Sequence, residues 1–274
     1  MLERFTYINS LGERLNFGNG GLFVNENDLR DFAWDISSKN NKISGFKKGI
    51  VTKTIPIIIN CDSEANGIAI RNDLFEVCEK DVLAKKYGRI QIGNYYLRCY
   101  ITGSKKSQYL IHKSHMVVSL VVATDLPEWI KETTTKHTMK SDTISTFLDY
   151  PYDFSHDFKQ PLVSATIKND NFVASNFIAK IYGEIVNPTF FIGQHMYSVN
   201  VAIGANEYLT IDSINKTIVL TEANGNEVNC FNNRNKTSYI FEKIPIGNNK
   251  VTSTNENLRF DLTLLEERSE PKWT

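Results

Sequence analysis

The chain has 274 residues, of which 31 are basic and 31 acidic, and a hydrophobic content of 41%. At roughly 100–200 residues per domain, this length predicts two domains. The zero net charge excludes a broad electrostatic attraction to nucleic acid or to an anionic membrane surface, because both require a basic excess. We therefore expect no nucleic-acid partner and no membrane partner.

The first residues, MLERFTYINSLGERLNF, carry charges and lack the apolar core of a signal peptide. The longest apolar stretches, 55–61 and 116–123, are too short to span a bilayer. We expect a protein that is made and folded in a cytoplasm. Its cysteines are scattered in apolar surroundings, which predicts buried free thiols. They are Cys61, Cys78, Cys99 and Cys230.

Short runs rich in Val, Ile, Tyr, Phe and Thr, separated by turn residues, predict a mainly β protein. In the first half, the expected strands are 5–9, 31–36, 49–54, 57–61, 89–92, 95–101 and 116–123. Pro56 interrupts one of these runs, which indicates an edge strand, a bulge or a break into two pieces.

One helix is expected, at Asp73–Lys86. Asp73 can cap its N-terminus, with Glu76 in the capping-box position, and Gly88 follows as a stop signal. A single helix among strands favours a β domain decorated by a helix over a wound α/β fold.

The stretch 131–161 differs from its surroundings. Its first part, Lys131–Thr146, is polar and Thr-rich with little periodicity, which predicts a linker. DYPYDFSHDF, at 149–158, then brings too many aromatic residues for a free coil. We expect an extended arm here that docks on its own surface or on that of a neighbour.

The second half returns to strands, spaced about ten residues apart, as in a β-sandwich. They are expected at 162–167, 177–182, 189–192, 196–201, 208–212, 217–220, 227–230, 238–241 and 257–265. Asn224-Gly225 predicts a two-residue hairpin turn. Alternation places four residues on one face: Leu258, Phe260, Leu262 and Leu264. The expected domains are 1–135 and 161–274, joined by a linker or arm at 136–160.

The sequence offers little catalytic chemistry. His112 and His115 form an H-x-x-H pair in a loop that enters a strand, without an apparent third metal ligand. His137, His156 and His195 are isolated. The glycine-rich 18–21 segment is not followed by a helix, so it predicts a turn and no phosphate cradle.

The remaining candidates are carboxylate pairs and aromatic side chains. Nothing fixes a cleft around the carboxylate pairs, which are Asp62/Glu64, Asp125/Glu128 and Glu266/Glu267, and no G-x-S-x-G motif occurs. We expect no catalytic, cofactor-binding or metal-binding residues, and no enzyme. Aromatic residues in the second half could stack on sugars, although core packing explains them better. They are Tyr182, Phe190, Phe191, Tyr197, Tyr208 and Tyr239.

The order of these signals resembles the distal tail proteins (Dit) of siphophages that infect Gram-positive bacteria. The similar segments begin with YINSLGERLNF and the helix-to-hairpin stretch RNDLFEVCEKDVLAKKYGRIQIGNYYLRCYI. They continue through LPEW, DYPYDFSHDF, IYGEIVNPTFFI, YLTIDSINKTIVL and SYIFEKIPIGNNKV to LEERSEPKW. No single motif is diagnostic, but their collinear order covers essentially the whole chain. Lys131–Thr146 is the least similar part.

This resemblance implies a mainly β protein of two domains. The N-terminal ring domain would be β-sandwich-like with one α-helix, and the C-terminal domain a sandwich like a galectin or a carbohydrate-binding module. It also implies a hexameric hub ring at the virion tail tip. The partners would be the major tail tube protein, the tail-associated hub or lysin protein, and receptor-binding or baseplate proteins.

Two alternatives stay open. The second sandwich could be a module that binds host cell-wall polysaccharide, and a tail-tip glycosidase would need two carboxylates in one cleft. A smaller pattern also repeats near the ends of the two halves, as Pro127-x-Trp129 and Pro271-x-Trp273. It suggests that the C-terminal tail packs back near the exit of the first domain, unless the repeat is coincidental.

Overall fold

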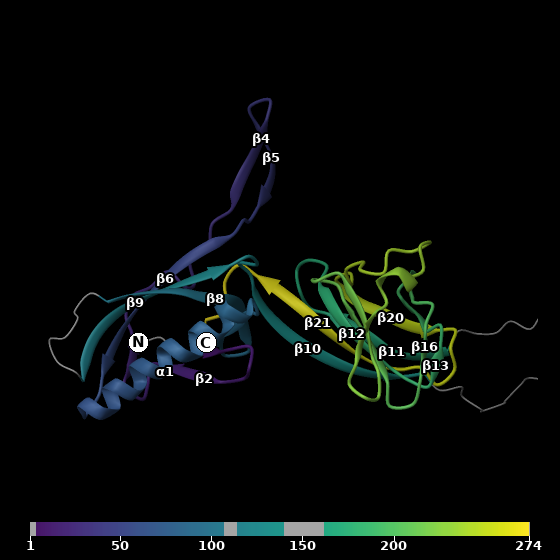
Figure 1. Cartoon of the computed structure of the whole chain (residues 1–274). Coiled ribbons are helices and arrows are strands. Elements are labelled where there is room, and N and C mark those ends of the chain that lie inside the picture. The colour runs from purple at the N-terminus through teal and green to yellow at the C-terminus, as the bar shows by residue number, and fades with distance from the viewer. Residues whose placement is uncertain (1–3, 107–113, 140–161, 274) are drawn as a thin grey trace, which may run out of the picture. The chain divides into compact units, whose positions relative to one another are not determined.

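The computed structural model describes residues 4–106, 114–139 and 162–273. The fold is mainly β, and α1 (Glu64–Ala84) is the one α-helix within these ranges. The chain forms two compact units (Figure 1). Unit 1 comprises residues 1–131 and 267–274, and unit 2 comprises residues 132–266.

Unit 1 contains two antiparallel sheets that share one long strand. Its strands are β1 (Phe5–Ile8), β2 (Arg14–Phe17), β3 (Leu22–Val24), β4 (Asp35–Lys39), β5 (Lys42–Lys47), β6 (Val51–Asn60), β7 (Gly88–Ile92), β8 (Tyr95–Lys106) and β9 (His115–Thr124). One sheet has the order β2-β1-β7-β8, and the other has the order β3-β6-β9-β8. The strand β8 pairs with β7 through Cys99 and with β9 from Tyr100 onward, so it belongs to both sheets.

Alternating buried and more exposed side chains on β6 and β9 form the core of unit 1. In β6 the side chains of Ile55, Ile57 and Ile59 are buried, and in β9 every second residue from Met116 to Val122 is buried. Successive side chains on a strand point to opposite faces, so each strand contributes one apolar row. The helix α1 covers part of this core with Leu74, Val77 and Cys78.

Pro56 does not break its strand. The strand β6 is continuous, and Pro56 pairs in register with Ser119 of β9. The carbonyl of Pro56 accepts from the backbone N–H of Asn25, just past the end of β3. Because the N and C=O of one strand residue point to the same side, the missing N–H faces the end of β3 and costs no bond to β9.

The predicted helix start at Asp73 is wrong, because α1 begins nine residues earlier at Glu64. Ser63 is the N-cap, and its hydroxyl accepts from the backbone N–H of Asn66. At the other end, Lys85 takes the left-handed conformation (φ 53°) and closes the helix. Gly88 is therefore not a helix stop, and it begins β7 instead.

Unit 2 is a sandwich of two antiparallel sheets. Its strands are most of β10 (Trp129–Thr138), β11 (Leu162–Asn169), β12 (Asn176–Tyr182), β13 (Ile185–Val186), β14 (Thr189–Ile192), β15 (His195–Ser198), β16 (Ala202–Ile203), β17 (Tyr208–Asp212), β18 (Thr217–Thr221), β19 (Glu227–Asn229), β20 (Gly247–Ser253) and most of β21 (Arg259–Arg268). One sheet has the order β19-β18-β17-β12-β21-β10 and the other β11-β20-β14-β15, with β13 pairing β16.

Aromatic rings fill the space between the two sheets of unit 2. Phe190 of β14 stacks on Phe260 of β21, with 4.7 Å between ring centroids, and on Tyr197 of β15 at 5.1 Å. Phe177 of β12 meets the edge of Tyr197 at 5.3 Å. These rings are at most 1% exposed. As predicted, Phe260 and its alternating partners on β21 face the core.

Several local predictions for the second half need correction. Residues 131–138 are not a linker, because they lie in β10, where Thr134 bonds to Thr263 across to β21. The predicted aromatic arm at 149–158 lies outside the described residues. No strand forms at 238–241, where the chain turns while still burying Ile240 and Phe241.

The turn between β18 and β19 forms a hairpin, but a longer one than predicted. The backbone of Glu222 bonds to that of Asn226, and Gly225 alone takes a positive φ, of 87°. Asn224 instead accepts from the Asn226 N–H with its side chain. Two central residues at positive φ would have been needed for the predicted two-residue turn.

The contact-based units also differ in extent from the predicted domains. Unit 2 begins at Glu132, and the last eight residues, 267–274, belong to unit 1. The chain enters unit 2 within β10 and leaves it within β21. A single cut along the sequence therefore cannot separate the two units.

Candidate interaction surfaces

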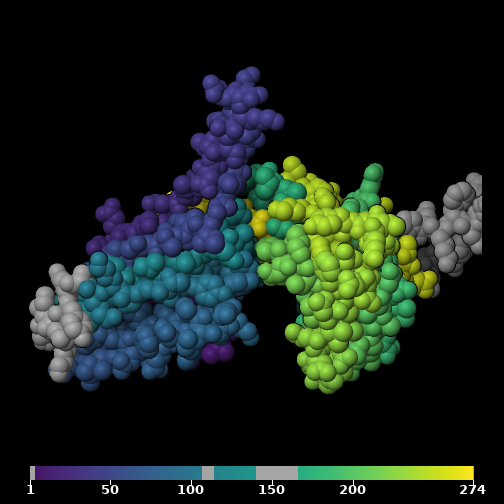
Figure 2. Space-filling model, turned by 45° about the horizontal axis from the view of Figure 1, so that its top comes forward, coloured from purple at the N-terminus to yellow at the C-terminus, as the bar shows by residue number. Residues whose placement is uncertain are grey.

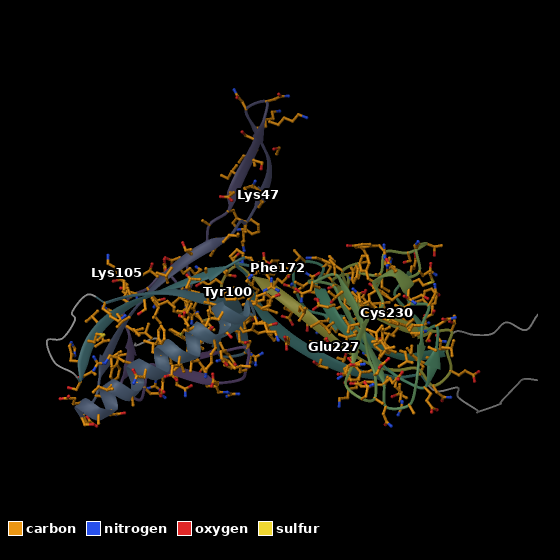
Figure 3. All side chains as sticks on the ribbon, viewed as in Figure 1. Lys47, Tyr100, Lys105, Phe172, Glu227 and Cys230 are labelled. Atoms are coloured by element: carbon orange, nitrogen blue, oxygen red, sulfur yellow. The ribbon has the colours of Figure 1, made fainter. Side chains whose placement is uncertain are left out.

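The β4–β5 hairpin projects from the rest of unit 1 (Figures 1 and 2). Its turn consists of Asn40 and Asn41, with φ of 52° and 57°. Two central residues at positive φ define a type I′ turn, and asparagine tolerates that conformation well. Every residue of the two strands is exposed except Gly45, which is partly buried. Lys47 marks the hairpin in Figure 3.

The register of this hairpin collects its apolar side chains on one face. Ile36 lies opposite Phe46, and Ser38 lies opposite Ile43, because a bulge falls between Ser37 and Ser38. Without that irregularity, Ile43 would point to the other side from Phe46. Ile36, Ile43 and Phe46 are 62%, 60% and 60% exposed. The hairpin thus carries an apolar face that is exposed in the described part of the chain.

Two lysines anchor the base of the hairpin. The Lys48 amino group lies 3.4 Å from Glu128, donates to Ser269 at 2.7 Å and sits over the Trp34 ring. Lys53 is buried, and it donates to the backbone carbonyls of Asp28 and Asp31. Burial lowers the pKa of Lys53, although Asp28 and Asp31 oppose the shift.

A buried polar junction holds α1 against β1. The Tyr7 hydroxyl donates to Asp81 at 2.5 Å, and the backbone N–H of Ser10 donates to the other carboxyl oxygen at 2.8 Å. Burial, with this hydrogen bond, raises the pKa of Tyr7. A methyl group at Gly88 would lie 2.4 Å from Asp81 and 2.6 Å from the Tyr7 oxygen. Only glycine lets β7 approach so closely.

A second contact fixes the same helix at its solvent side. Glu13 receives hydrogen bonds from Lys80 at 2.7 Å and from Asn9 at 2.6 Å. The bond from Lys80, followed by that from Asn9, lowers the pKa of Glu13, and the same ion pair raises the pKa of Lys80. Both groups are well exposed, so this contact orients α1 more than it stabilises the fold.

Between α1 and the β8–β9 sheet runs an open groove of about 750 Å³. The α1 side is formed by Ile68, Phe75 and Val82, which recur every seven residues and are all exposed. Seven residues make nearly two helical turns, so these side chains form one stripe beside the buried face of α1. The groove therefore has an apolar wall, with Glu79 and Lys106 also lining it.

The C-terminal tail packs on unit 1. Trp273 lies under the Arg30 guanidinium, 4.1 Å from ring centroid to the guanidinium carbon, and Arg30 also donates to the Pro271 carbonyl at 3.4 Å. Ser269 accepts from Lys48, which also pairs with Glu128, the neighbour of Trp129. The C-terminal tail therefore packs near the exit of the first domain, as the repeated Pro-x-Trp pattern suggested.

The aromatic residues proposed for sugar stacking separate into distinct environments. Phe190 and Tyr197 are core residues, whereas Tyr239 is exposed. Tyr182 and Tyr208 are partly buried neighbours on one sheet face of unit 2, with the Lys180 amino group 3.6 Å from the Tyr208 centroid. Phe191 is also partly buried. Among these six residues, only Tyr182 and Tyr208 together offer a partly exposed platform of more than one ring.

The other predicted candidates do not converge. Asp125 pairs with Arg98, while Glu128 pairs with Lys48. His137 is buried against Phe260, His195 bonds to the backbone of Tyr239, and His112 and His156 lie outside the described residues. Among residues 4–106, 114–139 and 162–273, no three His, Cys, Asp or Glu side chains gather as a metal site.

The predicted free thiols are confirmed for all four cysteines, although Cys61 is only partly buried. Burial raises the pKa of Cys78 to about 12, so this thiol stays protonated and unreactive near neutral pH. In the described ranges, no helix is long and apolar enough to cross a membrane.

The two units together have the fold of phage tail hub and baseplate proteins. The chain is similar to the crystal structure of the SPP1 Dit protein, with a TM-score of 0.59, 12% identity, and coverage of 97% of this chain and 100% of that one. That protein is described as a paradigm of the hub adsorption apparatus in phages that infect Gram-positive hosts. The resemblance read from the sequence is confirmed at the level of the fold.

A chain of the phage P2 baseplate in its activated conformation with Ca aligns with a TM-score of 0.63 at 12% identity, over 99% of this chain and 100% of that one. The corresponding structure with Sr aligns with a TM-score of 0.62 at 12% identity, over 98% and 99% of the two chains. No protein-family model matches the chain, and no curated protein matches it.

The β4–β5 hairpin and the α1 groove escaped sequence reasoning. The hairpin had a usable signal, because Asn40-Asn41 lies between two segments, ISSK and KISGF, that can pair around it. The groove had none, since it arises from where α1 lies on the sheet.

Proposed function

We propose that the chain is a non-enzymatic structural subunit of a phage or prophage tail tip, a distal tail protein that forms a hexameric hub ring. The observation that carries the proposal is the likeness of fold to hub and baseplate chains over nearly the whole sequence. The same likeness supports the domain roles that we propose: unit 1 builds the ring, and unit 2 is a galectin-like sandwich.

The proposed partners follow the same division. The ring would join the major tail tube protein to the tail-associated hub or lysin protein, and unit 2 would hold receptor-binding or baseplate proteins. The exposed apolar residues of unit 1 support its role in assembly, because large uncovered apolar patches mark interaction sites. The ring would form after synthesis in the host cytoplasm and remain at the virion tail tip.

Electron microscopy and native mass spectrometry test this proposal. The purified chain should give closed rings with the mass of six copies, and an antibody against it should label the tail tip of particles from the producing host. A monomer at high concentration together with unlabelled particles would refute the tail-tip role.

The partly exposed pair Tyr182 and Tyr208 supports a second candidate, a carbohydrate-binding module in unit 2. Pyranose rings stack on aromatic faces, and Asp261, which accepts from the Tyr182 hydroxyl at 2.9 Å, adds a polar group beside them. Retention of the chain by host cell-wall polysaccharide, abolished in Tyr208→Ala but kept in Tyr239→Ala, would favour this module. Equal retention of both variants would exclude this sheet face as the binding site.

A further inference from the structure

We infer that the aromatic segment 149–158 of one copy binds as an added β-strand in the α1 groove of a second copy. This segment, DYPYDFSHDF, lies outside the described residues. The contact rests on the proposed assembly of the chain, and it gives the segment a binding site. The observation behind it is that the groove in unit 1 is apolar, net basic and bordered by an unpaired strand edge.

The groove lies against an unpaired edge of β8. This strand pairs with β7 only as far as Cys99, and from Tyr100 to Lys106 it pairs with β9. Among the described residues, no strand pairs with the other edge of this second stretch. Four consecutive residues of β8, 101–104, line the groove. Consecutive residues border a hollow where a strand presents its edge, since only every second side chain points to a given face.

This edge and the helix together form a site for an extended peptide. From Gly103 to Lys106 the register with β9 is regular, so alternate residues direct their backbone N–H and C=O groups away from β9. Beside the edge, α1 presents the exposed apolar stripe of Ile68, Phe75 and Val82. Extended peptides bind an unpaired strand edge through backbone hydrogen bonds, and pockets beside the edge receive their alternate side chains.

The sequence of the segment suits strand addition. Tyr150, Tyr152 and Phe154 occupy alternate positions, so an extended backbone places the three rings on one face. Pro151 has no N–H to donate, and it is tolerated on a strand that keeps this position away from its neighbour. Tyr150 and Tyr152 would then bond to β8. The groove volume of about 750 Å³ lies within the range that encloses whole small molecules, so several side chains fit.

Charge favours this segment as the occupant. The charged residues that line the groove are Arg71, Glu79 and Lys106, and the exposed Lys105 adds a further positive charge to the edge of β8. The segment contains three aspartates and no lysine or arginine. Lysines on an edge strand discourage pairing with a second copy of the same edge, whereas an acidic strand is attracted to them.

The course of β10 favours the groove of a second copy. Within unit 1, Trp129 pairs with Leu97, and β10 runs antiparallel to β8. The groove lies towards the Lys106 end of β8, so the chain leaves unit 1 along β10 in the opposite direction. The segment follows β10 in the sequence. A contact between two different surfaces of identical copies is heterologous, and its repetition gives a ring when the rotation closes.

Photo-crosslinking of the full chain tests the inference. In the main variant p-benzoylphenylalanine replaces Tyr152, and in the matched control it replaces Phe172, an exposed ring of unit 2 (Figure 3). Mixed heavy- and light-isotope copies are irradiated, and the linked peptides are mapped by mass spectrometry. We expect mixed-isotope links from position 152 to residues 68–82 or 101–106, and none of these from position 172.

Hydrogen exchange tests the backbone bonds, which a contact between side chains alone would not form. In the assembled chain, the amides of residues 101–106 should exchange at least about tenfold more slowly than in the double variant Tyr152→Ser with Phe154→Ser, because bonded amides are protected. Tyr239→Ser, which removes an exposed ring of unit 2, is the control and should keep the protection. Equal exchange in the wild type and the double variant would contradict strand addition.

A synthetic peptide gives a third readout. A fluorescent peptide of residues 148–158 is titrated into a full-length variant whose own residues 148–158 are replaced by a Gly-Ser linker. Lys106→Glu should weaken its binding at least about fivefold, whereas Lys47→Glu, the same charge change on the β4–β5 hairpin, should change it less than about twofold. Equal effects of the two substitutions, or equal binding of a peptide that places the aromatic residues next to one another, would contradict the proposed site.

The outcomes separate this contact from the proposed function. Rings in the microscope with position 152 linked to another surface would overturn the binding site and leave the tail-tip role standing. Links between peptides of the same isotope alone would overturn the contact between copies in the same way. A chain that neither links nor forms rings would overturn both.

Discussion

Unit 1 and unit 2 are similar in length, but they differ in how they treat apolar surface. Thirteen of the nineteen large hydrophobic side chains that are exposed in the described residues belong to unit 1. Ten of these lie between Phe32 and Ile50 or on α1. Unit 2 instead encloses its aromatic rings between two sheets. Exposed apolar surface is therefore concentrated in unit 1, which fits the role in ring assembly that we propose for it.

The three tryptophans allow this comparison to be tested in the intact chain. Trp34, Trp129 and Trp273 all belong to unit 1. Tryptophan fluorescence therefore reports the unfolding of unit 1, while circular dichroism reports both units. Substitutions can then be assigned to the unit that they weaken.

The largest effect is expected for Phe260→Ala, which opens a cavity in the aromatic stack of unit 2. Replacing a buried phenylalanine by alanine costs about 3–5 kcal/mol. In urea unfolding, the circular dichroism transition should split, while the fluorescence transition keeps its midpoint. Phe172→Ala, which truncates an exposed ring of the same unit, is the control. A matching shift in fluorescence would show that the two units unfold together.

Gly88→Ala should be the most damaging small change in unit 1. The added methyl group collides with Tyr7 and Asp81, so the α1 junction must open, at about 3 kcal/mol. Fluorescence-monitored unfolding should shift to lower urea. Gly45→Ala, where a methyl group meets nothing within 4 Å, should leave the midpoint unchanged. Equal behaviour of the two variants would refute the close approach at Gly88.

Tyr7→Phe removes one hydroxyl from the same junction. The buried Asp81 carboxyl then keeps its bond from Ser10 but loses that from Tyr7, which should cost about 1–2 kcal/mol. The measurement is again fluorescence in urea, with Tyr239→Phe as an exposed control. An unchanged midpoint would mean that water replaces the hydrogen bond that the Asp81 carboxyl loses.

The pH dependence of unit 2 should show the buried His137. Burial lowers the pKa of His137 below its ordinary value of 6.5, so the unfolded chain takes up this proton first as pH falls. Stability is therefore lost as pH decreases below about 6.5 and through the folded pKa. The circular dichroism melting temperature should fall by a few degrees more in the wild type than in His137→Gln. Parallel pH profiles would contradict this assignment.

The smallest change in stability is expected at the hairpin. Ile43→Ser should alter the unfolding midpoint of the monomer by less than about 0.5 kcal/mol, because the side chain has no core to leave. A large loss measured in the monomer would show that the hairpin packs on its own chain. That result would remove the contrast between the two units.

Sequence reasoning succeeded where a strand alternates against a core. The bounds of β14 and β17 match the predicted strands, and the burial of their side chains alternates along each strand. It failed at β10, whose Thr-rich outer positions resemble a linker, although threonine is β-branched and suits a strand. The hairpin was missed for a related reason, since a strand pair without a core shows no alternation.

The first nine residues of α1, 64–72, were not predicted as helical because of their composition. Residues 64–72 include Gly67, Ile68 and Ile70, which are poor helix formers, and packing against the sheet outweighs that preference. The interaction surfaces depend on the register of β4 with β5 and on the position of α1. The Asn40-Asn41 turn indicates the hairpin, but the bulge that sets its apolar face and the position of α1 appear only in the three-dimensional arrangement.

The return of residues 267–273 to unit 1 has a consequence for synthesis on the ribosome. Unit 2 is an insertion in the chain of unit 1, so all of it emerges before Ser269 and Trp273 can reach Lys48 and Arg30. Domains fold as units during translation. The sandwich of unit 2 can therefore be complete while unit 1 still lacks these contacts. Synthesis of residues 267–273 then becomes the step that completes unit 1.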